Sequence, residues 1–218
     1  MEIWQELAKS EVFSLIDEQS IKALNFCFKS RLKFVEKNEI VINAGDTNEY
    51  CIFVLKGKLR SVNYDYYGAE SLISVYNKGE IFGLNEAYTN QDTYQNSLVA
   101  TEKSTIILFN RYRFIKECEN HCPRHKQLLK NVTNLIVKAN LEMVEKINVL
   151  QKRTIREKVL AYLHNISKKC NSKYFDIPLN RQELANYLAI DRSALSIELA
   201  KMKKDGLIDY NKNHFNLK

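Results

Sequence analysis

The sequence predicts an α+β chain with a β-rich N-terminal part, one long helix and a small helical part that ends in two strands. Three observations predict this class. Five of the six glycines fall between residues 45 and 83, where they separate short runs of β-branched and aromatic residues. Residues 124–152 contain neither Gly nor Pro, which is typical of an uninterrupted helix. Two short amphipathic helix patterns joined by a tight connection then follow near the C-terminus.

The N-terminal part, residues 1–120, is expected to begin with a helical segment from Ile3 to Leu32 and to continue as a β-barrel, sandwich or roll. Its first four glycines are 12, 11 and 11 residues apart, and glycine tolerates the positive φ that tight turns require. The short apolar runs around these turns are expected to be strands. These runs are residues 39–42, 50–55, 72–76, 97–100 and 104–109.

The middle part, residues 121–152, is expected to be one helix with an apolar stripe. The stripe residues are spaced alternately three and four apart, as in a coiled coil. They are Leu129, Val132, Ile136, Ala139, Met143, Lys146 and Leu150, with Lys146 as the break. Such a stripe needs a partner, either the same helix of a second chain or the chain's own β domain. We favour self-pairing, because a helix of about 45 Å overhangs a small β domain.

The chain carries a net charge of +7, and the whole excess lies at the C-terminus. Residues 1–149 contain 19 Lys and Arg and 19 Asp and Glu, whereas residues 150–218 contain 14 and 7. A polyanion is the simplest partner for such a basic segment, and an inert basic surface is the alternative.

The C-terminal part, residues 153–218, contains two short helix patterns joined by a tight connection. Asn180 followed by Glu183 is typical of a capping box at a helix start, and Asp191 is placed to cap the second helix. We expect apolar side chains to face the interior and the start of the second helix to face outwards. The inward residues are Leu184, Ala185, Leu188, Leu195, Leu199 and Met202, and the outward ones are Arg192, Ser193, Ser196 and Ile197.

A glycine and two short runs complete this part. Gly206 suits the position just after a helix end. Residues 207–210 and 214–217 are expected to form two short strands, a wing. A helix-turn-helix inserts its second helix into the major groove of DNA. Together with the basic charge, the pattern favours a DNA-binding protein over an ordinary helical hairpin.

The C-terminal part resembles the winged helix-turn-helix of the Crp/Fnr family of bacterial regulators. The similar stretches are residues 181–188, 191–196 and 203–208. Upstream, residues 56–57, 65–70 and 79–83 resemble that family's cyclic-nucleotide-binding-type β-roll, a double-stranded β-helix, and residues 124–152 are similar to its dimerisation helix. The resemblance implies a transcription regulator, controlled by an effector, that binds a palindromic DNA operator as a homodimer and contacts RNA polymerase.

The resemblance also implies roles for six side chains. The positions that contact bases are Arg192, Ser193, Ser196 and Ile197, and those that contact phosphates are Arg181 and Gln182. Arg192 is the first candidate, because Arg paired with guanine is the commonest specific base contact. Many family members have Glu in place of Ser193 and Arg in place of Ile197. Since Ile makes only apolar contacts, for instance to a thymine methyl, no known operator can be assumed.

In the β-roll, the resemblance implies an effector pocket. Its candidate residues are Gly79, Glu80, Gly83, Leu84, Asn96 and Ser97. The family's cyclic-nucleotide pocket also needs an Arg-Ser pair, whose Arg answers the phosphate charge. The corresponding stretch here, residues 92–101, contains no Arg. We therefore expect no cyclic AMP binding and no cofactor, and leave open whether the β-roll binds an unknown small-molecule effector or acts only as a scaffold.

The cysteines are expected to be structural thiols. Their count, five, is odd, and no export signal precedes them, which argues against a disulfide framework. The clustered N-terminal cysteines of the family's iron–sulfur sensors are absent, since no Cys lies in residues 1–26. Cys118 and Cys122 flank His121, with His125 nearby, but this spacing is not a zinc or cluster motif. We expect no metal site and no redox response there.

Two further expectations concern location and rival functions. No apolar run reaches the roughly 18 residues of a membrane span, and the first residues lack a signal-peptide pattern, so we expect a cytoplasmic protein without a membrane partner. One alternative is a small-molecule receptor module that regulates a protein partner without binding DNA. The other is an enzyme, which we do not expect, because no nucleophile–base set or phosphate-binding loop is present.

Overall fold

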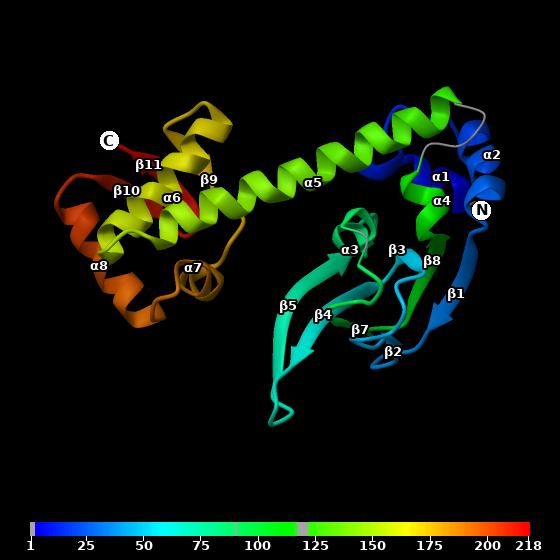
Figure 1. Ribbon diagram of the computed structural model, residues 1–218. Coiled ribbons are helices and arrows are strands. Elements are labelled where there is room, and N and C mark those ends of the chain that lie inside the picture. Colours follow the sequence, from blue (N-terminus) through cyan, green and yellow to red (C-terminus); the bar gives the residue numbers. More distant parts are fainter. Residues whose placement is uncertain (1–2, 90, 117–121) are drawn as a thin grey trace. The chain divides into compact units, whose positions relative to one another are not determined.

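The computed structural model describes residues 3–89, 91–116 and 122–218 (Figure 1). The chain folds into two compact units, Met1–Lys138 and Ala139–Lys218. The boundary between them lies inside the long helix α5 (Pro123–Leu150), which the absence of internal Gly and Pro predicted. The two units are called the N-terminal unit and the C-terminal unit below.

The N-terminal unit begins with three short helical segments. They are α1 (Ile3–Ala8), the 3-10 turn η1 (Glu11–Phe13) and α2 (Glu18–Phe28). α2 starts where the carboxylate of Asp17 accepts a hydrogen bond from the Ser20 amide at 2.9 Å, and it ends at Lys29, whose backbone is left-handed. The expectation that helix extends to Leu32 is wrong, because the strand β1 (Arg31–Val35) pairs with a later strand and so prevails over local helix preference.

The strands of this unit form two four-stranded antiparallel sheets, a β-roll that confirms the predicted α+β class. One sheet has the order β1-β8-β3-β6 and the other β2-β7-β4-β5. The remaining strands are β2 (Ile40–Ile42), β3 (Tyr50–Lys56), β4 (Lys58–Tyr64), β5 (Glu70–Asn77), β6 (Ile81–Phe82), β7 (Ser97–Ala100) and β8 (Ser104–Asn110). Two short helices, α3 (Leu84–Tyr88) and α4 (Arg111–Ile115), lie between and after them in the chain.

The chain passes from one sheet to the other through Gly57, the single residue between β3 and β4. Its φ is 88°, in the left-handed region that glycine adopts without strain. A Cβ at this position would lie 2.2 Å from Oγ of Ser104. Glycine is therefore required at this corner both for its backbone angle and for the close approach of β8.

The N-terminal unit contains two apolar cores. One fills the interior of the roll and includes Ile52, Phe82, Tyr94 and Leu98. The other lies between the roll and the helices and combines aliphatic side chains with phenylalanine rings; it is called the aromatic core below. Its largest members are Phe13, Phe28, Phe53, Phe109 and Phe114. The ring centroids of Phe109 and Phe114 are 4.9 Å apart in a stacked arrangement, and full burial of each such side chain contributes about 1.5–3 kcal/mol.

The first half of α5 packs on this second core, which corrects the predicted stripe. Leu128 and Val132 are fully buried in it, and Ile136 is partly buried against it. Val132 was expected to face a second chain and instead faces its own domain. The large apolar side chains of α5 that remain exposed come later in the helix. They are Val137, Leu141, Met143, Val144 and Ile147.

The C-terminal unit packs three helices against a three-stranded antiparallel sheet of order β10-β11-β9. Its elements are α6 (Ile155–Cys170), β9 (Tyr174–Asp176), α7 (Arg181–Leu188), α8 (Arg192–Lys204), β10 (Ile208–Asn211) and β11 (His214–Leu217). The hairpin of β10 and β11 is the predicted wing. The third strand, β9, is only three residues long and pairs with β11.

Candidate nucleic-acid interface

α7 starts as its local sequence predicts. Asn180 and Glu183 form a full capping box: the Asn180 side chain accepts from the Glu183 amide at 3.0 Å, and the Glu183 carboxylate accepts from the Asn180 amide at 2.7 Å. The helix ends at Ala189, whose φ of 51° is left-handed. This reversal, together with the Ile190 amide that donates to the Ala185 carbonyl at 3.1 Å, turns the chain sharply towards α8.

α8 presents one polar face to solvent and buries the other. Leu195, Leu199 and Met202 are fully buried against the core of the C-terminal unit, as predicted. The opposite face of its first two turns is exposed and carries Arg192, Ser193, Ser196 and Ile197. The prediction for Asp191 is only half right. It occupies the N-cap position, but within the described part of the chain its side chain makes no capping hydrogen bond.

The position of α8 is fixed by an arginine at the start of α6. Arg156 makes ion pairs with Glu198 at 2.6 Å and with Asp205 at 2.8 Å, near the middle and the end of α8. The hydrogen bond to Glu198 raises the pKa of Arg156 further above its ordinary value. Because these contacts join residues more than 40 positions apart, the spacing of charges along the sequence gives no signal for them.

Arg181 and Gln182, the predicted phosphate contacts, differ in their surroundings. Gln182 is exposed at the start of α7. Arg181 is half-buried, and its guanidinium Nη2 donates to the Lys212 carbonyl in the wing at 2.8 Å. Burial lowers the pKa of Arg181 from its ordinary value.

The helix-turn-helix and the wing border an open, basic pocket with a volume of about 680 Å³. Its lining consists of Asn180, Arg181, Gln182, Arg192, Lys212, Asn213 and His214. The sequence places three of these, Lys212, Asn213 and His214, in the wing but does not include them in the candidate site. The basic residue in the wing turn is the signal that could have identified them. We define these seven residues as the basic surface.

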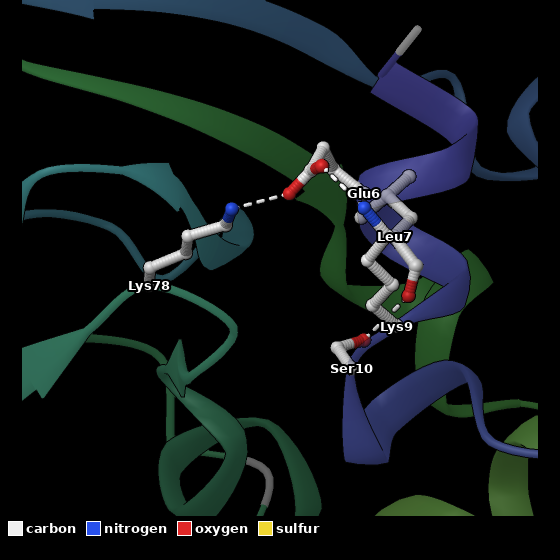
Figure 2. Close-up of polar contacts among 5 residues, drawn as sticks. All are labelled: Glu6, Leu7, Lys9, Ser10 and Lys78. Atoms are coloured by element: carbon white, nitrogen blue, oxygen red, sulfur yellow. Dashed lines mark hydrogen bonds and ion pairs between the residues drawn. The ribbon is translucent and has the colours of Figure 1, made fainter.

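In the N-terminal unit, the predicted effector residues Gly79 and Glu80 lie in the turn between β5 and β6. The carboxylate of Glu80 accepts from the Asn77 amide at 2.7 Å and so closes this turn. Lys78 of this turn forms an ion pair with Glu6 of α1 (Figure 2). The Glu6 carboxylate also pairs with Lys9 at 2.9 Å. The hydrogen bond from Lys78, followed by that from Lys9, lowers the pKa of Glu6 to about 2.

The other four effector candidates do not share one environment. Leu84 is buried in the aromatic core next to the helices, whereas Ser97 is buried in the roll and its hydroxyl accepts from the Ala44 amide at 2.9 Å. Gly83 packs closely, since a Cβ there would lie 3.1 Å from the Tyr50 carbonyl. Asn96 is half-buried.

Two buried groups near this region were not singled out from the sequence. Tyr94 lies inside the roll, where it stacks on Phe82 with ring centroids 5.7 Å apart and donates its hydroxyl to the Tyr50 carbonyl at 2.7 Å. Arg111 is 2% exposed, and its guanidinium donates to the Gln91 carbonyl and to the Tyr112 hydroxyl. Nothing in the local sequence distinguishes Tyr94 and Arg111 from exposed aromatic and basic residues, because their burial depends on the fold.

The described cysteines and histidines show no arrangement for a metal. No group of three or more His, Cys, Asp or Glu side chains that could hold an ion occurs among the described residues. Cys118 and His121 lie outside the described residues. His125 is buried and its Nε2 lies 3.2 Å from the Phe114 carbonyl. Cys51 is buried, and this raises the pKa of its thiol to about 12, so it stays protonated.

No helix in the described parts of the chain is long and apolar enough to cross a membrane.

Two protein-family models match this sequence. Residues 32–121 match the cyclic nucleotide-binding domain, and residues 157–218 match the Crp-like helix-turn-helix domain. Among solved structures, the Thermus thermophilus catabolite activator protein superposes with a TM-score of 0.55 at 17% identity, over 96% of this chain and 94% of that one. The Xanthomonas campestris regulator CLP superposes with a TM-score of 0.56 at 19% identity, over 92% and 99%. These likenesses show the fold.

Curated relatives agree with both family matches. The anaerobic regulatory protein of Haemophilus influenzae is 21% identical over 88% of this chain and 74% of its own length. The transcriptional activator protein FnrA of Stutzerimonas stutzeri is 23% identical over 89% and 79%. Proteins of this kind are regulators and not enzymes. With a cyclic-nucleotide-binding-type β-roll, a long helix and a Crp-like helix-turn-helix in this order, the chain belongs to the Crp/Fnr family of DNA-binding transcription regulators.

Proposed function

We propose that α8 enters the major groove of an operator N-terminus first and reads bases there. The observation that carries the proposal is the exposed polar face at the start of α8, opposite the buried Leu195 and Leu199. Arg192 is assigned to guanine, because its guanidinium matches the O6 and N7 acceptors. Ile197, which is 58% exposed, is assigned to a thymine methyl. Ser193 and Ser196 contact the edges of neighbouring bases.

The basic surface is proposed to hold the phosphate backbone next to this groove. Gln182 lies in the first turn of α7, where the unpaired amides and the helix dipole favour an anion. Arg181 and Lys212 add positive charge on the same concave surface. Such contacts fix the register of the duplex and carry no sequence information themselves.

A homodimer is proposed to form through α5. Val137, Leu141 and Val144 are spaced four and three residues apart, each is about half exposed, and together they form one stripe. Two copies of this helix can bury that stripe against each other. A two-fold axis along the pair then predicts a palindromic operator, with half-sites about one helical turn apart.

The N-terminal unit is proposed to act as a sensor, with a small molecule other than cyclic AMP as the effector. Gly79, Glu80, Gly83, Leu84, Asn96 and Ser97 remain the candidate effector residues. The stretch from Asp92 to Thr101 lacks the Arg that a cyclic phosphate needs, and Tyr94 fills part of the roll interior. Residues 1–120, 121–152 and 153–218 are then the sensor, the dimer helix and the DNA-binding segment of a cytoplasmic regulator that contacts RNA polymerase.

The test is selection of bound duplexes from a random DNA pool by the full chain, followed by affinity measurements on Arg192→Ala. The expected site is a palindrome. Arg192→Ala should weaken binding to it by about 1–3 kcal/mol and relax the preference at one base pair of each half-site. Lys201→Ala, an exposed change in the last turn of the same helix, is the matched control and should leave the preference unchanged.

Two results would contradict the proposal. An asymmetric, single-copy site would exclude the dimer arrangement. Absence of any sequence preference in the full chain would favour the alternative, a receptor module that regulates a protein partner.

A further inference from the structure

Arg181 reaches across from the first residue of α7 to the wing. Its guanidinium carbon lies 5.0 Å from the ring centroid of Tyr210 and 5.1 Å from that of Phe215. These two rings stack on each other with centroids 5.6 Å apart. Its Nη2 donates to the Lys212 carbonyl at 2.8 Å, at the turn between β10 and β11. One side chain therefore contacts both strands of the wing and the turn that joins them.

These contacts enclose the guanidinium. Its Nη1 is shielded from solvent and has no hydrogen-bond partner among the described residues. Burial lowers the pKa of the group, in contrast to Arg156, whose pKa is raised by its carboxylate partners. A side chain whose only role is to meet a phosphate gains nothing from being desolvated against aromatic rings, because its charge is then less accessible to the duplex.

The tip of the wing belongs to the same surface as the two helices. Lys212 and Asn213 of its turn and His214 at the start of β11 line the basic surface together with Gln182 and Arg192 from the two helices. β9 supports the wing on its β11 side, and the Ile177 amide donates to the Asn213 carbonyl at the tip of the wing at 3.0 Å, but neither contact joins that tip to α7. The bond from Arg181 to the Lys212 carbonyl fixes that tip relative to the start of α7.

We propose that Arg181 is a positioning residue: it locks the wing turn against the helix-turn-helix, so that wing and helices meet the same stretch of DNA backbone. This inference rests on the proposed DNA binding and deepens it. It predicts that the planar, stacking guanidinium matters, and not only the positive charge. Lysine keeps the charge but lacks the planar fork that stacks on rings while it donates a hydrogen bond.

The experiment compares the affinity of the full chain for its selected operator among variants of this contact. Arg181→Ala should weaken binding roughly tenfold, in keeping with a desolvated cation–π contact plus a hydrogen bond. Arg181→Lys should lose nearly as much, within threefold of Arg181→Ala. Tyr210→Phe, which keeps the ring face, should bind like the unchanged protein. Tyr210→Leu should weaken binding, and should add little to Arg181→Ala when the two are combined.

Each arm has an outcome that overturns the inference. If Arg181→Lys binds like the unchanged protein, the residue acts as a simple phosphate cation. If Arg181→Ala has no effect, or if its loss and that of Tyr210→Leu add in full, the contact does not position the wing. Circular dichroism confirms that each variant is folded, and the Arg181→Lys arm stands without the Tyr210 variants. Arg192→Ala is measured in parallel, because normal binding by that variant would instead contradict the proposed base reading.

Discussion

Ala189 ends α7 in the left-handed backbone region, with a φ of 51°, and so makes the turn of the helix-turn-helix. A residue with a Cβ pays about 1–2 kcal/mol for this conformation, whereas glycine does not. Glycine also has more entropy to lose on folding, about 0.4–1 kcal/mol. The turn is therefore held by the packing of α7 and α8 against the local preference of its own residue.

We predict that Ala189→Gly raises the free energy of unfolding of the C-terminal unit by about 0.5–1 kcal/mol, the difference between these two terms. Differential scanning calorimetry of the full chain measures it. The matched control is Gly206→Ala, at a φ of 72°, where a Cβ would meet no described atom within 4 Å. That change should destabilise by about 1 kcal/mol for backbone reasons alone. A lower transition temperature for Ala189→Gly would show that the left-handed residue is not strained.

At the same scale, local patterns predicted well only what depends on neighbours in sequence. The capping box of Asn180 and Glu183 is confirmed because its partners are three residues apart. Arg181 lies beside it, but the contacts that enclose it come from residues about 30 positions later. Sequence gives the charge of such a side chain and leaves its surroundings undetermined.

At the scale of elements, Glu6 ties α1 to the turn between β5 and β6 (Figure 2). The folded state holds its pKa at about 2, below the ordinary value of 4.5. A carboxylate whose pKa is lowered by folding stabilises the folded state at pH values above its ordinary pKa of 4.5. This contribution is lost as the pH falls from 4.5 towards 2. The tie is thus present at neutral pH and absent in strong acid.

We therefore predict that Glu6→Gln destabilises the N-terminal unit at pH 7, and that its urea unfolding curve converges with that of the unchanged protein as the pH is lowered from 4.5 to about 2. The fluorescence of Trp4, two residues away in α1, follows the transition. Glu102→Gln, at an exposed position between β7 and β8, serves as the control and should show no such convergence. A difference that stays constant with pH would rule out the ion pair as its source.

The long helix α5 gives the second prediction about elements. Val144→Glu places a charge in the exposed stripe that contains Leu141, so it should turn the dimer into a monomer, with a dissociation constant raised at least a hundredfold. Analytical ultracentrifugation measures the change. Ala139→Glu is the control, because Ala139 belongs to the stripe predicted from sequence but lies on the other side of the helix from Leu141 and Val144. If Ala139→Glu, and not Val144→Glu, produced a monomer, the dimer would instead form through the stripe predicted from the sequence, which contains Ala139.

The same helix shows what periodicity leaves open. The heptad pattern identified a long amphipathic helix correctly, since a 3.5-residue repeat is a local property. It could not show that Val132 packs on the aromatic core of its own domain, because a core on the β-roll and a second helix accept the same side chains. Burial in the folded unit decides between them.

At the scale of the whole molecule, the charge is divided as the function requires. The entire excess of +7 lies in residues 150–218, while residues 1–149 sum to zero. A DNA-binding segment gains from such a field because neutralised phosphates release their counterions. Residues 1–149, which carry no net charge, do not attract nucleic acid away from this segment.

We predict a steep salt dependence for operator binding by the full chain. For six to eight phosphate contacts per dimer, the slope of log K against log salt concentration should be roughly −5 to −7. Fluorescence anisotropy between low and moderate salt measures it. Lys212→Ala should make the slope shallower by about two in a dimer, one per wing, whereas Lys103→Ala, an exposed change in the N-terminal unit, should leave it unchanged. A slope near zero would exclude phosphate binding by the basic surface.

The order of the parts, the α+β class, the start of α7, the buried face of α8 and the location of the charge could all be predicted from the sequence. All of these depend on spacing, composition and contacts between near neighbours. Contacts in the folded protein determine which face of α5 is buried, that β1 replaces the end of the predicted N-terminal helical segment, and that Arg181 is enclosed by the wing. The reason is physical: these outcomes depend on partners that are distant in the chain, and a residue's preference yields to the larger energy of burial in the assembled fold.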